Sequence, residues 1–300
     1  MMKNDLYQLA FAGRRHYYMK IGIAQVRSVL GRVDKNIEIH KKMIKQARQE
    51  GVDLLIFPEL SLTGYNLLDL TFDVARKMAD EEIQSLIAEA NGIDVVFGFV
   101  EQSPEYLLFN SALYASEQKV RYIHRKIYLP TYGMYDEARY FGHGSSIRSF
   151  STRFGQVGIL ICEDVWHMSA PYILAQDGAE ILIVMANSPA KGIQAEGLVT
   201  RDAWYSIMQN HAGQHGMYTL FANRVGAEDG VAFFGGSTVA NPFGEIEKTA
   251  SLFTEELFIT QLEMDQVRRA RFKMPLLRDE NLDLVIRELQ RIQKKRCREG

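Results

Sequence analysis

Cysteine is nearly absent from this sequence, since Cys162 and Cys297 are the only two among its 300 residues. Two cysteines so far apart cannot build the cross-linked framework of a small secreted domain or a four-cysteine metal site. A reducing compartment is the natural setting for free thiols, so we expect a cytoplasmic protein. Either cysteine is then available for chemistry.

Long apolar runs are also missing. Charged side chains interrupt every hydrophobic stretch, and none reaches the roughly 18–20 residues that a membrane-spanning helix needs. The formal net charge is only −2, which gives no electrostatic reason to expect nucleic acid or an anionic membrane as a partner. A small molecule is therefore the expected ligand.

Residues 1–18 show no clear pattern of secondary structure. An apolar stretch at residues 6–12 follows Lys3, but it is short and broken by Gln8, which disfavours a secretory signal. We expect these residues to form a disordered extension, or to precede a true initiator at Met19, because the first strand pattern begins directly afterwards.

The rest of the chain alternates between strand and helix patterns, with 47% apolar and 24% charged residues. This composition and length predict one α/β domain over residues 19–275 and a helical tail over residues 276–300. Strands are expected at residues 20–25, 52–57, 93–100, 107–116, 119–124, 155–162, 180–186, 218–223, 237–241 and 256–263, and helices at residues 33–50, 71–90, 169–176 and 195–215.

Cys162 ends a predicted apolar strand and precedes the polar pair Glu163 and Asp164. A strand-to-helix turn offers backbone N–H groups to a thiolate and to an oxyanion formed by its attack, so the position suits a nucleophile. Taken alone, the position is better explained by a buried structural cysteine, because free cysteines are often buried.

Two further segments carry charge next to predicted strands. Glu59 follows Phe57 and Pro58 at the end of a buried strand, where a general base can sit. Lys126 leaves another predicted strand and is followed by Leu129 and Pro130. Taken alone, the second segment is better explained as a basic loop.

Together, the three segments resemble the nitrilase-like carbon–nitrogen hydrolases, in which an acid after a Phe-Pro-Glu strand, a lysine ahead of a leucine and a proline, and a cysteine after an apolar strand follow in this order. The resemblance runs from about Met19 to Pro275. It implies a four-layer α-β-β-α sandwich, with Glu59 as base, Lys126 as oxyanion stabiliser and Cys162 as nucleophile. No metal or organic cofactor is implied.

The resemblance also implies a supporting set. Glu137 matches a second acid that orients the lysine and the substrate, and the Glu163 backbone N–H is expected to face the oxyanion. The remaining supporting or substrate-orienting residues are Tyr65, Tyr132, Trp166, His167 and Asn187. His124, His143 and His167 lack the spacing of metal ligands, so His167 is expected only to line the pocket.

Within this superfamily, the segments around Tyr132 and Cys162 look most like the glutaminase part of glutamine-dependent NAD synthetases. The phosphate-binding Ser-Gly-Gly-x-Asp-Ser loop of the full synthetase does not occur in the sequence. We therefore expect a free-standing amidase acting on a small linear amide. The alternatives are an N-carbamoyl amide hydrolase, a glutaminase that supplies ammonia to a partner, and a catalytically silent binding or scaffold protein.

The tail repeats apolar residues at helical spacing, with Leu282, Ile286 and Leu289 on one side. Such a stripe needs a cover, and the resemblance implies pairing through the C-terminal segment and helices near the nucleophile. We expect a homodimer or a larger homo-oligomer.

Overall fold

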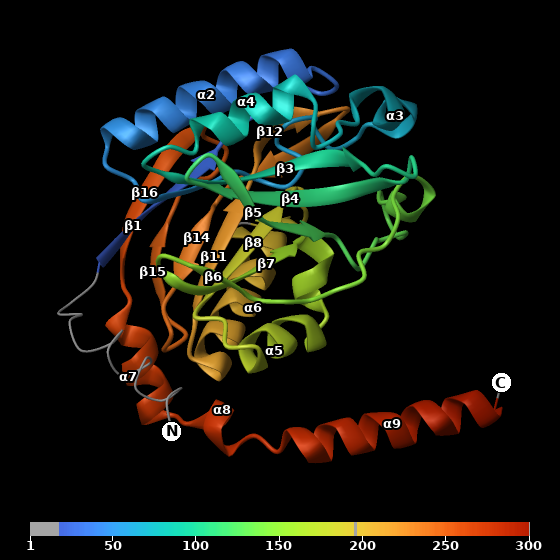
Figure 1. The fold of residues 1–300 in the computed structure, drawn as a ribbon, viewed down its shortest axis with the longest axis vertical. Coiled ribbons are helices and arrows are strands. Elements are labelled where there is room, and N and C mark those ends of the chain that lie inside the picture. The colour runs from blue at the N-terminus through green and yellow to red at the C-terminus, as the bar shows by residue number, and fades with distance from the viewer. Residues whose placement is uncertain (1–17, 195–196, 300) are drawn as a thin grey trace.

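Two six-stranded sheets lie face to face in the computed structural model, which describes residues 18–194 and 197–299 (Figure 1). Helices α2 (Val33–Gln49) and α4 (Glu81–Glu89) cover the outer side of the first sheet, and α5 (Ser169–Gln176) and α6 (Val199–His215) cover that of the second. The predicted α-β-β-α sandwich is confirmed.

The first sheet has the order β16-β1-β2-β3-β4-β5. Its strands are β16 (Glu256–Glu263), β1 (Tyr18–Gln25), β2 (Leu54–Ile56), β3 (Asp94–Gln102), β4 (Leu108–Ser116) and β5 (Lys119–Arg125). Successive side chains of β2 point to opposite faces of the sheet, so they pack in two different hydrophobic cores. Leu54 and Ile56 pack between the sheets, whereas Leu55 and Phe57 pack under the outer helices.

The second sheet has the order β15-β14-β11-β8-β7-β6. Its strands are β15 (Ile246–Thr249), β14 (Thr238–Ala240), β11 (Tyr218–Asn223), β8 (Ile181–Ala186), β7 (Gly155–Ile161) and β6 (Phe150–Thr152). β8 is parallel to both neighbours, and all six of its residues are buried. Its continuous apolar run follows from burial on both faces.

The helix predicted over residues 71–90 is wrong, because the chain forms two helices there, α3 (Thr71–Val74) and α4. Ala75 has an extended backbone and ends α3. Arg76 then pairs with β3, donating its backbone N–H to Val100 and accepting that of Gln102. This strand pairing replaces the helical hydrogen bonds that the side-chain pattern favoured.

Several short strands have no counterpart in the predicted pattern. They are β6, β15, the pair β9 (Ile193–Gln194) and β10 (Gly197–Leu198), and the hairpin β12 (Val225–Glu228) with β13 (Val231–Phe234). The helix predicted from residue 195 begins at Val199, after β10. Residues 195 and 196 lie outside the described part of the chain, as do residues 1–17.

After β16 the chain continues through α7 (Asp265–Lys273), α8 (Leu276–Asp279) and α9 (Leu282–Glu299). α9 is the predicted tail helix, and it extends away from the sandwich beneath α5 in Figure 1. Leu282, Ile286 and Leu289 are 43%, 46% and 59% exposed. Within residues 18–194 and 197–299, no helix is long and apolar enough to cross a bilayer.

Candidate active site

Three charged or nucleophilic residues follow strands that end on the same side of the two sheets. Glu59 comes three residues after β2, Lys126 directly after β5, and Cys162 directly after β7. All three side chains are buried, with at most 8% exposure. The structure therefore brings together the residues predicted as base, oxyanion stabiliser and nucleophile.

Lys126 lies at the centre of the cluster. Its Nζ donates to Glu59 Oε1 at 2.8 Å and to Glu137 Oε1 at 2.7 Å. Burial opposes the charge on this lysine, but Glu137 and Glu59 outweigh that effect and raise the pKa of Lys126 well above its usual value. An ammonium group has three donors, so one N–H remains for a third acceptor.

Glu59 is held by donors on both carboxylate oxygens. Besides Lys126, Asn110 Nδ2 donates to Oε1 at 2.8 Å and the Asn187 backbone N–H donates to Oε2 at 2.9 Å. The Asn187 side chain also donates to the Glu59 carbonyl oxygen at 2.8 Å. Asn187, predicted as a supporting residue, thus fixes both the backbone and the carboxylate of Glu59.

Glu137 and Tyr65 form the other side of the lysine site. The Tyr65 hydroxyl donates to Glu137 Oε1 at 2.5 Å, the oxygen that also binds Lys126. Burial raises the pKa of Glu137 to about 7, against the opposing attraction of Lys126. Glu137 is therefore easier to protonate than an exposed glutamate.

Cys162 is the first residue of the short helix η3 (Cys162–Trp166), at the sharp turn that follows β7 (Gly155–Ile161). Its φ of +47° lies in the left-handed region, which is uncommon for a non-glycine residue and is found at strained functional turns. Burial, followed by the charge of Glu59, raises the pKa of the Cys162 thiol well above its usual value. The thiol is thus protonated at rest and needs a base before it can attack.

Asp164, whose side chain is fully buried, fixes this turn. Its Oδ2 accepts the Ile161 backbone N–H at 3.0 Å and His124 Nε2 at 2.8 Å. Its Oδ1 accepts the backbone N–H groups of Ile127 and Tyr128. Burial alone would raise the pKa of Asp164, but these donors, His124 foremost, lower it below its usual value.

The remaining predicted residues are at least partly exposed. Tyr132, 59% exposed, donates its hydroxyl to Glu163 Oε2 at 2.7 Å. His167 stacks on Tyr128 with ring centroids 3.5 Å apart, and its Nε2 lies 3.8 Å from Glu163 Oε1. Trp166 is 44% exposed and packs edge-on against Trp204.

Sequence reasoning missed Asn110 and gave Asp164 no role. Asn110 lies within β4, where neither a turn nor a strand end draws attention to it. Asp164 does carry a signal, because an acid two residues after a nucleophile at a turn can bind the freed N–H groups. Among the described residues, no group of three or more His, Cys, Asp or Glu side chains is arranged to hold a metal ion.

Comparison with known proteins points to one family of enzymes. The family model described as carbon–nitrogen hydrolase matches residues 20–272. The glutamine-dependent NAD(+) synthetase of Acinetobacter baylyi is 30% identical over 249 residues, covering 83% of this chain and 45% of that protein. A nitrilase of Pyrococcus abyssi is 30% identical over 259 residues, covering 84% of this chain and 93% of that protein.

Among solved structures, a carbon–nitrogen hydrolase from Helicobacter pylori G27 matches with a TM-score of 0.78 and 24% identity, covering 91% of this chain and 99% of that one. At this identity the likeness establishes the fold alone. The chain spans less than half the length of the synthetases it matches.

Proposed function

Because the chain belongs to the carbon–nitrogen hydrolase family, we propose that it hydrolyses the amide bond of a small linear substrate through a thioester on Cys162. Ammonia or an amine is the first product. The observation that carries the proposal is the buried Lys126, bonded at once to Glu59 and Glu137 beside a thiol whose pKa their charges shift.

The first step uses Glu59 as a base. Glu59 accepts the Cys162 proton while the sulfur attacks the amide carbonyl carbon, so a C–S bond forms and the carbonyl π electrons move onto oxygen. Pairing proton removal with attack suits a thiol whose pKa is raised by burial. Lys126 stabilises the oxyanion with the N–H that Glu59 and Glu137 leave unused, and the Glu163 backbone N–H is the second proposed donor.

The tetrahedral adduct then collapses. The C–N bond breaks as Glu59 returns its proton to the leaving nitrogen, which departs as ammonia or an amine. Glu59 next takes a proton from water, whose oxygen attacks the thioester carbon. Expulsion of the sulfur, which regains a proton from Glu59, releases the carboxylic acid and restores the enzyme.

Ammonia release from a panel of short aliphatic amides, N-carbamoyl amines, glutamine and nitriles tests this proposal. We expect turnover of at least one linear amide, and its loss in Cys162→Ala. Activity on nitriles alone would overturn the amidase assignment. Silence across the panel by folded protein would favour a binding or scaffold role instead.

Glutamine is the second candidate substrate. Its support comes from the similarity to glutamine-dependent NAD(+) synthetases and from the hydrogen bond between Tyr132 and Glu163 beside the nucleophile. The Glu163 carboxylate could pair with the α-ammonium group of glutamine. Comparing glutamine with glutaramate, the monoamide of glutaric acid that differs from glutamine only in lacking the α-ammonium group, separates the two: a kcat/KM at least about tenfold higher for glutamine would favour the glutaminase.

A further inference from the structure

Glu228, the last residue of β12, carries a buried carboxylate that the proposed reaction does not use. Its Oε2 accepts a hydrogen bond from Arg224 Nη1 at 2.7 Å, and both side chains are at most 3% exposed. Its Oε1 accepts the backbone N–H groups of Tyr65 at 3.0 Å and Asn66 at 2.5 Å. This single carboxylate thus ties β12 to the loop that presents Tyr65.

We propose that Glu228 is a positioning residue for the catalytic cluster, holding the Tyr65 backbone so that the Tyr65 hydroxyl reaches Glu137. The inference rests on the proposed function, since it concerns the same cluster. Tyr65 donates to Glu137 Oε1 at 2.5 Å, and this oxygen also accepts Lys126 Nζ at 2.7 Å. Glu228 acts on Lys126 only through Tyr65 and Glu137.

The loop between Glu59 and Tyr65 has little freedom to move. Gly31 donates its backbone N–H to the Thr63 carbonyl oxygen at 2.8 Å. Gly64 has a φ of +84°, and a Cβ there would lie 2.9 Å from both Glu228 Oε2 and the Leu30 backbone. A loop packed this closely transmits a displacement of its anchor to Tyr65.

The electrostatics of Glu137 give this role a measurable consequence. Its carboxylate faces Lys126, Glu59 and Tyr65, and its charge also acts on Cys162. Burial raises the pKa of Glu137, whereas the Tyr65 hydrogen bond lowers it. Losing that bond therefore moves the protonation of Glu137 to higher pH.

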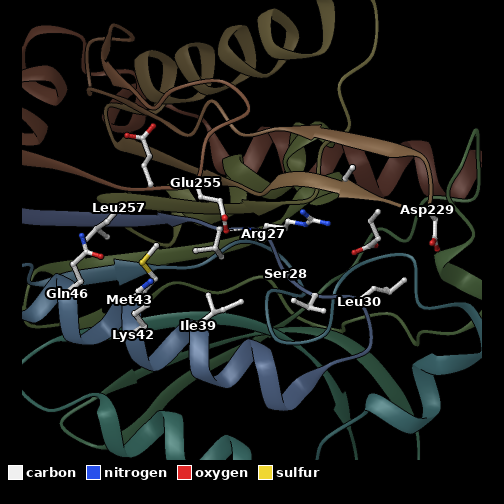
Figure 2. A pocket seen from close by; sticks show the side chains of 15 residues that line it. Arg27, Ser28, Leu30, Ile39, Lys42, Met43, Gln46, Asp229, Glu255 and Leu257 are labelled. Carbon is white, nitrogen blue, oxygen red and sulfur yellow. Dashed lines mark hydrogen bonds between the residues drawn. The ribbon is translucent and has the colours of Figure 1, made fainter.

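Glu228 lines a pocket of about 710 Å³ between α2, the segment after β1, the end of β12 and the start of β16. Figure 2 shows this pocket. The next residue, Asp229, lines the same pocket but bonds the Asn66 side chain at 2.9 Å instead of the Tyr65 backbone. Glu255 lies on another wall and bonds the Arg27 backbone N–H. Asp229 and Glu255 are matched controls, because they line the same pocket as Glu228 but do not accept the Tyr65 backbone N–H.

The test measures how the alkylation rate of Cys162 by iodoacetamide varies with pH, followed by intact-protein mass. Cys297, which is exposed, is replaced by Ser throughout so that one thiol remains. The Glu137 inflection is identified by its loss in Glu137→Gln. Glu228→Asp keeps a charge for Arg224 but is one methylene too short to reach Arg224 and the Tyr65 N–H together. Glu228→Gln keeps the length and loses the charge.

We expect Glu228→Asp, Glu228→Gln and Tyr65→Phe each to move that inflection to higher pH by about 0.5–1 unit, the effect of one hydrogen bond. Asp229→Asn and Glu255→Gln should leave it in place. On a substrate, kcat should fall about 10–100-fold with little change in KM. Combining Tyr65→Phe with Glu228→Asp should add little to either alone.

Wild-type inflections in folded Glu228 variants would overturn the inference, as would shifts of equal size in Asp229→Asn. If both Glu228 variants unfold, Glu228 is needed only for folding, and the inference is also overturned. Alkylation needs no substrate. If the wild-type protein releases no ammonia from any amide, the proposed function is wrong. The alkylation experiment still decides whether Glu228 positions Tyr65.

Discussion

Asp164 accepts the backbone N–H of Ile127 at 3.0 Å, so the residue two places after the proposed nucleophile Cys162 holds the residue next to Lys126. The same carboxylate holds Ile161, the residue before Cys162. Asp164 thus fixes the relative positions of the thiol and the ammonium group. Because misplacement of reacting groups by about 1 Å can cost about 10²-fold in rate, this buried carboxylate is central to the geometry.

Asp164→Asn is therefore expected to lower kcat/KM by about 10²-fold. The amide keeps the shape but turns an NH₂ group toward donors, leaving at least one backbone N–H or the His124 ring without its acceptor. Steady-state kinetics with a thermal melt check it. Asp177→Asn is the control, since Asp177 also accepts a backbone N–H, from Ser149, at an exposed site. Equal activities in the two variants would contradict the assignment.

How far the sequence predicts this site depends on how many residues along the chain separate the two partners of each contact. Glu59, Lys126 and Cys162 follow strands with recognisable patterns, but it was the resemblance to carbon–nitrogen hydrolases, and not these patterns, that predicted their convergence. Asn110 and Glu228 reach the cluster through packing between segments 51 and 163 residues apart, and nothing local marks them. The helix predicted through Ala75 failed for the same reason, because pairing with β3 overrides a local preference.

Cys162 and Cys297 should differ completely in their effect on turnover. Cys162→Ala is expected to abolish ammonia release without unfolding the protein, because it removes the atom that forms the thioester. Cys297→Ala should leave turnover unchanged, as that cysteine is exposed on α9. Intact mass after quenching with a slow amide should show the acyl adduct in wild type and Cys297→Ala only. An adduct that persists in Cys162→Ala would refute the assignment.

Because of the buried His40, we expect the folded protein to lose stability in acid. His40 stacks on Phe57 with ring centroids 4.0 Å apart and contacts Ser61 Oγ at 2.9 Å, on either side of Glu59. Burial lowers the pKa of His40 to about 4 from an ordinary value near 6.5. As the pH falls, the unfolded chain therefore binds a proton at this histidine before the folded chain does. The stability that the neutral His40 provides above pH 6.5 is lost as the pH falls toward 4.

The loss through His40 is at most roughly 3–4 kcal/mol, from about 1.4 kcal/mol per pKa unit. Urea unfolding at a series of pH values should show it as a positive slope of unfolding free energy against pH between about 4 and 6.5. His40→Gln should be less stable at neutral pH and show a shallower slope, whereas the exposed His143→Gln should keep the wild-type slope. Identical slopes in wild type and His40→Gln would refute the prediction.

The exposed apolar side of α9 leads us to propose that the protein forms a homodimer through this helix. Leu282, Ile286 and Leu289 are spaced along one side and remain 43–59% exposed. Sedimentation velocity should give a dimer for wild type and a monomer for Ile286→Glu combined with Leu289→Glu. Arg287→Ala, on the same helix, should stay dimeric. A monomeric wild type at tens of micromolar would end the proposal.

Lys126 and Arg125 are adjacent cations with different surroundings, and this contrast tests the mechanism. Lys126 is fully buried between two carboxylates, whereas Arg125 pairs with Glu101 and lies over the Phe109 ring at 4.0 Å. Lys126→Met keeps the bulk and removes the oxyanion donor, so kcat/KM should fall by about 10²–10³-fold or more. Arg125→Met removes a partly exposed ion pair and should lower the melting temperature more than the rate. Kinetics and melting curves on both variants separate the two effects. Similar, mild losses of rate would exclude Lys126 from the chemistry, because a charge that stabilises the transition state cannot be removed without slowing the reaction.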